Sequence, residues 1–193
     1  MCDINAENFP AFLFFTAARL TARPPFGYNI QKQQGEKGMV RVLFVCLGNI
    51  CRSPMGEFIL KDLAASRGVA DRLEIASAGT SGEEEGNPVY LPARTQLAKH
   101  GIRCDGKRAR RLRPADGAAY DYILCMEEVN VRDARRICGA DAPAAIVRLL
   151  DYSARPRDIA DPWWTRDFAK AYADIAEGCA AFLDYLAREG KLA

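Results

Sequence analysis

The chain is poor in the groups that mark several common classes of protein. It has one histidine, and its seven cysteines show no paired metal-ligand spacing, so no metal site and no cofactor are expected. No apolar run approaches the length that spans a bilayer, and no membrane association is expected. A formal net charge of only +2 argues against a dedicated nucleic-acid surface.

The chain is nevertheless long enough for one α/β domain with a tail. It has 193 residues, of which 49% are hydrophobic, so a sizeable core is available. Residues 1–38 differ from the rest, because a phenylalanine-rich run at 9–15 is followed by prolines and a polar stretch. Three interpretations stay open: a flexible tail, a docked arm, or residues upstream of the native start. Since Met39 directly precedes the first strand, we favour a tail or an upstream segment and place the domain at 39–193.

The stretch from residue 40 to residue 54 organises the rest. Val40–Val45 is a β-branched and aromatic run that is typical of a buried strand. A short loop, Cys46–Arg52, follows, and Ser53-Pro54 opens a helix with a favoured cap and a favoured first-turn residue. Such a joint aims several backbone N–H groups and the positive end of the helix dipole at one spot. The sequence therefore predicts an anion site.

Two side chains make this anion site reactive. Arg52, at the loop exit, offers a fork that matches phosphate oxygens. The same positive field favours the thiolate form of Cys46 near neutral pH. A thiolate beneath a bound phosphate is placed for in-line attack on phosphorus. We expect phosphoryl transfer through a phosphocysteine, without a metal.

The bare spacing Cys-x5-Arg is not specific, since Cys104 and Arg110 repeat it. The segment 104–110 follows no apolar strand and leads into further arginines, so it is interpreted as a solvated basic loop. Only the Cys46 segment has strand, loop, glycine, arginine and helix in order.

Beyond this stretch, strand and helix patterns alternate. Strands are expected at 73–77, 120–126 and 145–150, and helices at 53–67, 92–100, 129–137 and 165–188. With the first strand, this order predicts a single-domain, flavodoxin-like α/β fold: a four-stranded parallel sheet with helices on both faces. Ligands of such sheets bind beyond the carboxyl ends of the strands, where Cys46 lies.

The leaving oxygen needs a proton, so a carboxylic acid must reach the site from another loop. Asp161 is the candidate, because Pro162 restricts its backbone and Trp163 and Trp164 can wall the pocket. Asp158 is the alternative. In the second step the same carboxylate would activate the attacking water.

Three segments resemble the low-molecular-weight protein tyrosine phosphatases. They are the loop 43–54, the third-strand segment 123–130 and the Asp-Pro-aromatic-aromatic sequence 161–164. The likeness runs from about residue 40 to about residue 186, in the family's order. It implies the same fold, and it implies phosphotyrosine hydrolysis with Cys46 as nucleophile, Arg52 as clamp and Asp161 as acid.

The resemblance also implies a phosphate loop and its support. The loop residues are Leu47, Gly48, Asn49, Ile50, Cys51, Arg52 and Ser53. Side-chain hydrogen bonds from Asn49 and Ser53 would hold the loop in a strained, receptive shape. Ser77 and His100 take the places of a serine and a histidine that join this network in the family. Ser53 is also expected to help the thiolate leave.

Two positions bear on redox control and on substrate choice. Family members pair the nucleophile with a second loop cysteine, so Cys51 is expected to capture oxidised Cys46 as a reversible disulfide. Glu83 departs from the family, which often places an aromatic wall there. The acidic run 83–85 is either a solvated loop or an altered rim that disfavours acidic peptides, with Trp163 and Trp164 as the aromatic walls.

Three other functions compete with this interpretation. Arsenate reduction would need a thiol relay, but position 132 is Arg132 where the partner of Cys125 is required. Protein-arginine phosphatases carry threonine where this chain has Ile50. A non-catalytic phosphate-binding module would lack the nucleophile or the acid.

The expected setting follows from the resemblance and from the thiol. The expected partner is a phosphotyrosine protein, with a cognate tyrosine kinase as a candidate, and the protein itself is expected to be a monomer or a weak dimer. A catalytic thiolate suits the reducing cytoplasm.

Overall fold

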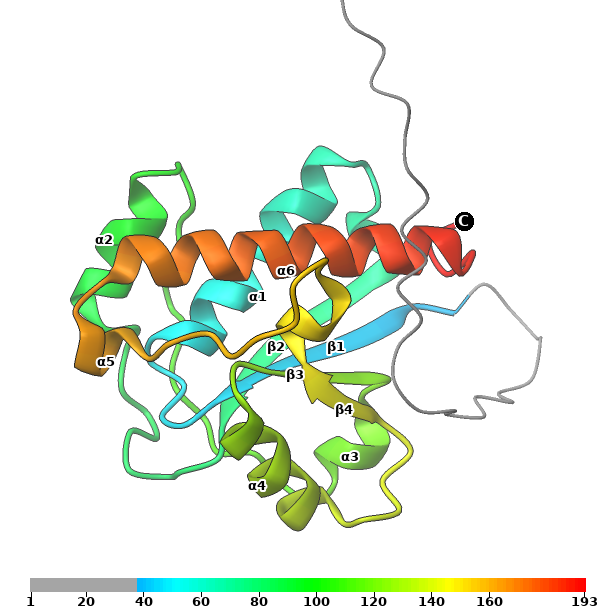
Figure 1. The fold of residues 1–193 in the computed structure, drawn as a ribbon, viewed down its shortest axis with the longest axis horizontal. Coiled ribbons are helices and arrows are strands. Elements are labelled where there is room, and N and C mark those ends of the chain that lie inside the picture. Colours follow the sequence, from blue (N-terminus) through cyan, green and yellow to red (C-terminus); the bar gives the residue numbers. More distant parts are fainter. Residues whose placement is uncertain (1–37) are drawn as a thin grey trace, which may run out of the picture.

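The computed structural model describes residues 38–193, so the prediction for residues 1–38 lies almost wholly outside the described residues. A four-stranded parallel sheet in the order β2-β1-β3-β4 forms the centre of the fold (Figure 1). Its strands are β1 (Val40–Cys46), β2 (Leu73–Gly79), β3 (Tyr122–Cys125) and β4 (Ala145–Arg148). The predicted single-domain α/β fold with a parallel sheet is confirmed.

Helices cover both faces of the sheet (Figure 1). The α-helices are α1 (Arg52–Ser66), α2 (Leu91–Ala98), α3 (Asp116–Ala119), α4 (Glu128–Cys138), α5 (Pro162–Thr165) and α6 (Phe168–Arg188). Two 3-10 turns, η1 (Ala70–Arg72) and η2 (Leu149–Tyr152), complete the list. Helices α1, α2 and α6 pack on one face, and α3 and α4 lie on the other.

The alternation of side chains along β1 explains why this strand is central. Val42 and Phe44 face the core beneath α1 and α6, whereas Leu43 and Val45 face the core beneath α4. All four side chains are fully buried, as expected for a parallel strand that is covered on both faces. The chain therefore leaves the middle of the sheet at Cys46.

The C-terminal helix begins later than the sequence pattern predicts. A single turn, α5, ends at Arg166, whose backbone is left-handed with a φ of 60°. Asp167 then caps α6 by accepting the backbone N–H of Lys170 at 2.8 Å. The predicted helix 165–188 is thus divided by a left-handed residue, and the part that follows Asp161 is a separate turn.

Loops at the carboxyl edge of the sheet are held close to one another. Gly79 ends β2 so near the phosphate loop that an added Cβ would lie 2.6 Å from the Leu47 carbonyl oxygen. The N–H groups of Thr80 and Ser81 donate to the carbonyls of Cys46 and Leu47, both at 2.9 Å. Within residues 38–193 we find no helix with the length and apolar character that crossing a membrane requires.

Candidate active site

The loop 47–51 connects β1 directly to α1. Asn49 is left-handed, with a φ of 57°, a conformation that asparagine tolerates better than most residues. Helix α1 begins at Arg52, one residue earlier than predicted, and Cys51 at its N-cap position makes no side-chain cap. Ser53 is therefore not the helix cap that its position suggested. Its hydroxyl points back into the protein, toward Cys46.

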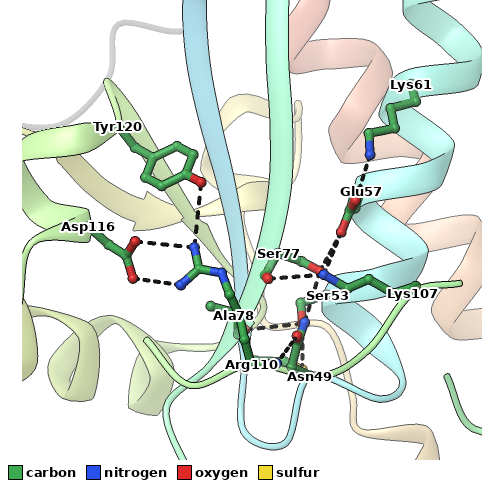
Figure 2. A network of polar contacts seen from close by, with 11 residues as sticks. Asn49, Ser53, Glu57, Lys61, Ser77, Ala78, Lys107, Arg110, Asp116 and Tyr120 are labelled. Atoms are coloured by element: carbon green, nitrogen blue, oxygen red, sulfur yellow. Dashed lines mark hydrogen bonds and ion pairs between the residues drawn. The ribbon is translucent and has the colours of Figure 1, made fainter. Parts of the chain in front are cut away.

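A buried network of polar contacts connects Asn49, Ser53 and Ser77 (Figure 2) and reaches the Cys46 thiol through Ser53. Ser53 Oγ lies 3.0 Å from Cys46 Sγ. Asn49 Nδ2 donates to Ser53 Oγ and to Ser77 Oγ, each at 2.9 Å. Ser77 Oγ donates in turn to Glu57 Oε2 at 2.6 Å. Three of the predicted residues, Asn49, Ser53 and Ser77, are thus brought together with the thiol.

Two groups with a fixed role, one a donor and one an acceptor, set the direction of the hydrogen bonds in this network. The backbone N–H of Arg110 must donate, and it donates to Asn49 Oδ1 at 3.0 Å, so the Asn49 NH₂ group faces the two serines. An ionised Glu57 must accept, so it takes the Ser77 hydrogen. Ser53 Oγ then accepts from Asn49, and its own hydrogen is directed to Ala78 O at 3.3 Å or to Cys46 Sγ. A thiolate is the stronger acceptor, so Ser53 stabilises it.

Ion pairs fix both ends of this hydrogen-bond network, and Figure 2 shows them on either side of β1. Arg110 forks onto the Asp116 carboxylate, with N–O distances of 2.8 and 3.2 Å. Glu57 accepts from Lys107 Nζ at 2.9 Å and from Lys61 Nζ at 2.6 Å. Burial alone would raise the pKa of Glu57, but Lys107 and the hydrogen bonds outweigh burial and lower it. Glu57 is therefore ionised at neutral pH.

The prediction that His100 supports the loop is wrong. His100 is exposed just after α2, stacks on the Tyr172 ring with a centroid distance of 3.8 Å, and has Gln96 Nε2 at 3.4 Å. Lys107 and Glu57 occupy the place next to Ser77 instead. The cation next to Ser77 is thus a lysine from the loop after α2.

We expect Lys107→Met to lower kcat/KM for an aryl phosphate by about 10- to 100-fold, because the loop loses the charge that orients its buried carboxylate. Alkylation of Cys46 by iodoacetamide at neutral pH should slow in parallel. Lys61→Met is the matched control: it also removes a Glu57 ion pair, but the Lys61 side chain is 43% exposed against 12% for Lys107. Equal losses in the two variants would contradict a special role for Lys107.

Lys107→Met should also change how the stability of the fold depends on pH in the acid range. Because the folded pKa of Glu57 lies below its ordinary value of 4.5, Glu57 stabilises the fold above that pH, and the contribution is lost as pH falls through the folded pKa. Without Lys107 the folded pKa rises and this contribution shrinks. Acid unfolding followed by circular dichroism should therefore begin at a higher pH in Lys107→Met than in the wild type.

The Arg52 side chain is also buried, with only 1% of it exposed. Its Nη1 donates to the Ile159 carbonyl at 2.9 Å, and its Nη2 contacts Asp161 Oδ2 at 2.6 Å and Glu127 Oε1 at 2.8 Å. Burial would lower the pKa of Arg52, but Cys46, Asp161 and Glu127 together raise it. The guanidinium therefore stays charged beside the candidate acid, and its charge is favoured by that of Cys46.

The Asp161 carboxylate is held between two elements. Its second oxygen, Oδ1, accepts the backbone N–H of Trp163 at 3.0 Å and so caps α5. The loop before it is tied to the sheet, because the Ile159 N–H donates to the Met126 carbonyl at 2.8 Å. Arg52, from near the start of the domain, and Asp161, from near its end, thus meet at one site.

The alternative acid, Asp158, is used elsewhere. It accepts the backbone N–H of Glu128 at 3.1 Å and pairs with Arg148 at 3.0 Å. Its carboxylate therefore anchors the loop to α4 and β4, whereas Asp161 contacts the clamp arginine.

The second loop cysteine is a buried, neutral thiol. Burial raises the pKa of Cys51 to about 12, and the negative charges of Cys46 and Asp161 add to the effect. Cys51 therefore does not compete with Cys46 as a nucleophile near neutral pH.

The pocket rim differs in part from the expected one. Glu83 is exposed, and it is the neighbouring Glu84 that lies over the phosphate loop, with its Cγ 3.1 Å from the position of an added Gly48 Cβ. Trp163 packs against Tyr90, whereas Trp164 is 79% exposed. Trp163 is therefore the better placed of the two predicted tryptophan walls.

Sequence reasoning missed Glu57, Lys107 and Glu127. Glu57 lies one helical turn after Ser53, and a carboxylate among the buried positions of α1 was a readable signal. Glu127 follows β3, which pairs in parallel with β1, so its nearness to the loop could have been inferred from strand order. Lys107 lies in an irregular segment and left no comparable signal.

Comparison with known proteins adds independent observations. A family model described as low molecular weight phosphotyrosine protein phosphatase matches residues 41–192. The low molecular weight protein-tyrosine-phosphatase YfkJ of Bacillus subtilis is 39% identical over 156 residues, covering 80% of this chain and all of that protein. Its crystal structure matches with a TM-score of 0.76 at 38% identity, covering 81% of this chain and 99% of that one. A Drosophila structure named arginine phosphatase matches with a TM-score of 0.68 at 31% identity, covering 75% and 96%.

Proposed function

Because the chain belongs to the low molecular weight phosphotyrosine protein phosphatase family, we propose that Cys46, Arg52 and Asp161 perform its cysteine-dependent hydrolysis of phosphotyrosine. The observation that supports this assignment best is the meeting of three groups. The Ser53 hydroxyl lies 3.0 Å from Cys46 Sγ, and Arg52, whose charge interacts with that of Cys46, contacts Asp161 at 2.6 Å.

The first step transfers the phosphoryl group to sulfur. The Cys46 thiolate attacks phosphorus, an S–P bond forms, and the P–O bond to the phenol breaks. Backbone N–H groups of the loop 47–52 and the Arg52 fork bind the equatorial oxygens as charge develops on them. Asp161 gives its proton to the leaving oxygen, so the product leaves as a neutral phenol.

The second step returns the enzyme to its starting state. The Asp161 carboxylate accepts a proton from water as the water oxygen attacks phosphorus. The S–P bond breaks and the thiolate leaves with its charge stabilised by the Ser53 hydroxyl. Inorganic phosphate is released, and Asp161 is again protonated for the next cycle.

The contacts of Arg52 suggest how substrate prepares the acid. The guanidinium is paired with Asp161 and Glu127. A phosphate dianion offers Arg52 a bidentate partner, and Asp161 then has an anion in place of a cation beside it. This exchange frees the Asp161 carboxyl from the guanidinium, so it can face the leaving oxygen in the first step.

A substrate panel tests the function. We expect phosphotyrosine peptides to be hydrolysed, and phosphoarginine and arsenate with a thiol donor to be poor substrates. Arsenate reduction is disfavoured because Cys125 is fully buried, so its pKa is well above the ordinary value, and residue 132 is an arginine. Preferential hydrolysis of phosphoarginine would replace the phosphotyrosine assignment with that of an arginine phosphatase.

Cys51 is proposed as the resolving thiol of a reversible oxidation. Peroxide converts the Cys46 thiolate to a sulfenic acid, and attack by the Cys51 sulfur forms the disulfide and expels water. Excess peroxide oxidises an unprotected sulfenic acid further, to a sulfinic acid that dithiothreitol does not reduce. After treatment with excess peroxide, we therefore expect dithiothreitol to restore the activity of the wild type, whereas Cys51→Ser stays inactive. Recovery in both proteins, or in neither, would exclude Cys51 as the resolving thiol.

The proposed setting is the cytoplasm, with a phosphotyrosine protein as substrate and a cognate tyrosine kinase as a candidate partner. A catalytic thiolate is best preserved in a reducing compartment. All six cysteines that the structure describes are free thiols, which fits that environment. We propose a monomer or a weak dimer that binds neither nucleic acid nor membrane, and size-exclusion chromatography with light scattering tests the oligomeric state.

A further inference from the structure

We propose that Tyr90 is a positioning residue that connects the phosphate loop to the acid loop and holds Asp161 in its proton-donating pose. The inference rests on the proposed function, because it concerns the same acid. Tyr90 lies at the N-cap position of α2, between the phosphate loop and the short turn that follows Asp161.

The backbone of Tyr90 is fixed to the phosphate loop. Its N–H donates to the Ile50 carbonyl at 2.8 Å, and its own carbonyl accepts the N–H of Arg94 at 3.0 Å in the first turn of α2. The start of α2 therefore moves with the loop that binds the phosphoryl group.

The ring of Tyr90 is fixed to the acid loop. Its centroid lies 5.2 Å from that of Trp163, with an interplanar angle of 54°, and 6.0 Å from that of Phe168 at the start of α6. These are the spacings of attractive tilted aromatic pairs. The Arg166 guanidinium lies over the Trp163 ring at 5.6 Å. The Trp163 ring thus contacts both Tyr90 and Arg166.

Trp163 connects the Tyr90 ring to the Asp161 carboxylate. Its backbone N–H donates to Asp161 Oδ1 at 3.0 Å, so the direction of the carboxylate follows the position of Trp163. Helix α5 has only four residues and ends at the left-handed Arg166. A single turn is not stable by itself, so its pose depends on what packs against it. Tyr90 is the ring from the phosphate-loop side that packs there.

The test uses the different need of two substrates for an acid. Phenyl phosphate releases a phenol with a pKa of about 10 and depends on proton donation. Para-nitrophenyl phosphate releases a far more acidic phenol and depends on it much less. We expect Tyr90→Ala to lower kcat/KM for phenyl phosphate about tenfold more than for para-nitrophenyl phosphate. Tyr90→Phe should stay close to the wild type.

Leu91→Ala is the matched control, because Leu91 is the next residue of the same helix start and is 67% exposed. It should leave both substrates unchanged. If Tyr90→Ala does not fold, Tyr90→Leu provides a bulky side chain without the ring and tests the same contact. Inhibition by inorganic phosphate should be nearly unchanged in the Tyr90 variants, since the phosphate loop remains intact.

A double mutant separates the inference from the function on which it rests. In an Asp161→Ala background, Tyr90→Ala should not lower kcat/KM for phenyl phosphate any further, because the carboxyl that Tyr90 positions is absent. Equal losses on both substrates, or full additivity with Asp161→Ala, would overturn the positioning role and leave Tyr90 as a wall or a packing residue. If Asp161→Ala itself fails to discriminate the two substrates, it is the acid assignment that is wrong.

Discussion

Replacing Cys46 by serine is expected to lower turnover of aryl phosphates by at least about 10⁴-fold, because a serine hydroxyl is not ionised at neutral pH. The loop amides and Arg52 stay in place, so inorganic phosphate should still bind. Release of phenol measures turnover, and the rise in melting temperature with phosphate concentration measures binding.

The chain supplies a matched control for this prediction. Cys104 has the same spacing to an arginine, Arg110, but lies in the loop after α2, and the side chain of that arginine is committed to Asp116. Cys104→Ser should therefore keep full turnover. Substantial activity in Cys46→Ser, or its loss in Cys104→Ser, would contradict the assignment of the nucleophile.

Replacing Asp161 by alanine is expected to lower kcat/KM for phenyl phosphate by about 10²- to 10⁴-fold, the usual contribution of a general acid. The loss should be much smaller for para-nitrophenyl phosphate. Phosphate should bind at least as tightly as in the wild type, because Arg52 loses a carboxylate that competes for its Nη2. Steady-state kinetics with the two substrates and phosphate inhibition measure these effects.

Asp158→Ala is the control for the acid, since Asp158 lies three residues earlier in the same loop and pairs with Arg148. Its removal should loosen the loop slightly and leave the dependence on the leaving group unchanged. If Asp158→Ala reproduced the substrate discrimination expected for Asp161→Ala, the roles of the two carboxylates would have to be exchanged.

Local chemistry made the central part of the site predictable. The run 40–45 predicts a buried strand. The loop that follows, with its glycine, its arginine and the start of a helix, indicates an anion site from neighbouring residues alone. The alternation of strands and helices fixed the parallel sheet and placed Cys46 at its carboxyl edge. Asp161 could be predicted because the Asp-Pro-Trp-Trp sequence that marks it is also local.

Contacts between distant segments were not predictable. Glu57 and Lys107 are fifty residues apart and meet only because the loop after α2 returns beside β2. His100 was chosen as the only histidine near the expected position, whereas its ring in fact stacks on α6. The break between α5 and α6 was hidden because Arg166 adopts a left-handed backbone that its residue type does not signal.

Formation of a phosphocysteine on Cys46 can be tested directly. The enzyme is quenched in acid during steady turnover of para-nitrophenyl phosphate, and the trapped phosphoryl group is located by peptide mass spectrometry. We expect a phosphate on the sulfur of Cys46 in the wild type and none in Cys46→Ser. A trapped phosphate on another residue would contradict this mechanism. So would the absence of any trapped phosphate from both the wild type and Asp161→Ala, in which hydrolysis of the intermediate is slowed.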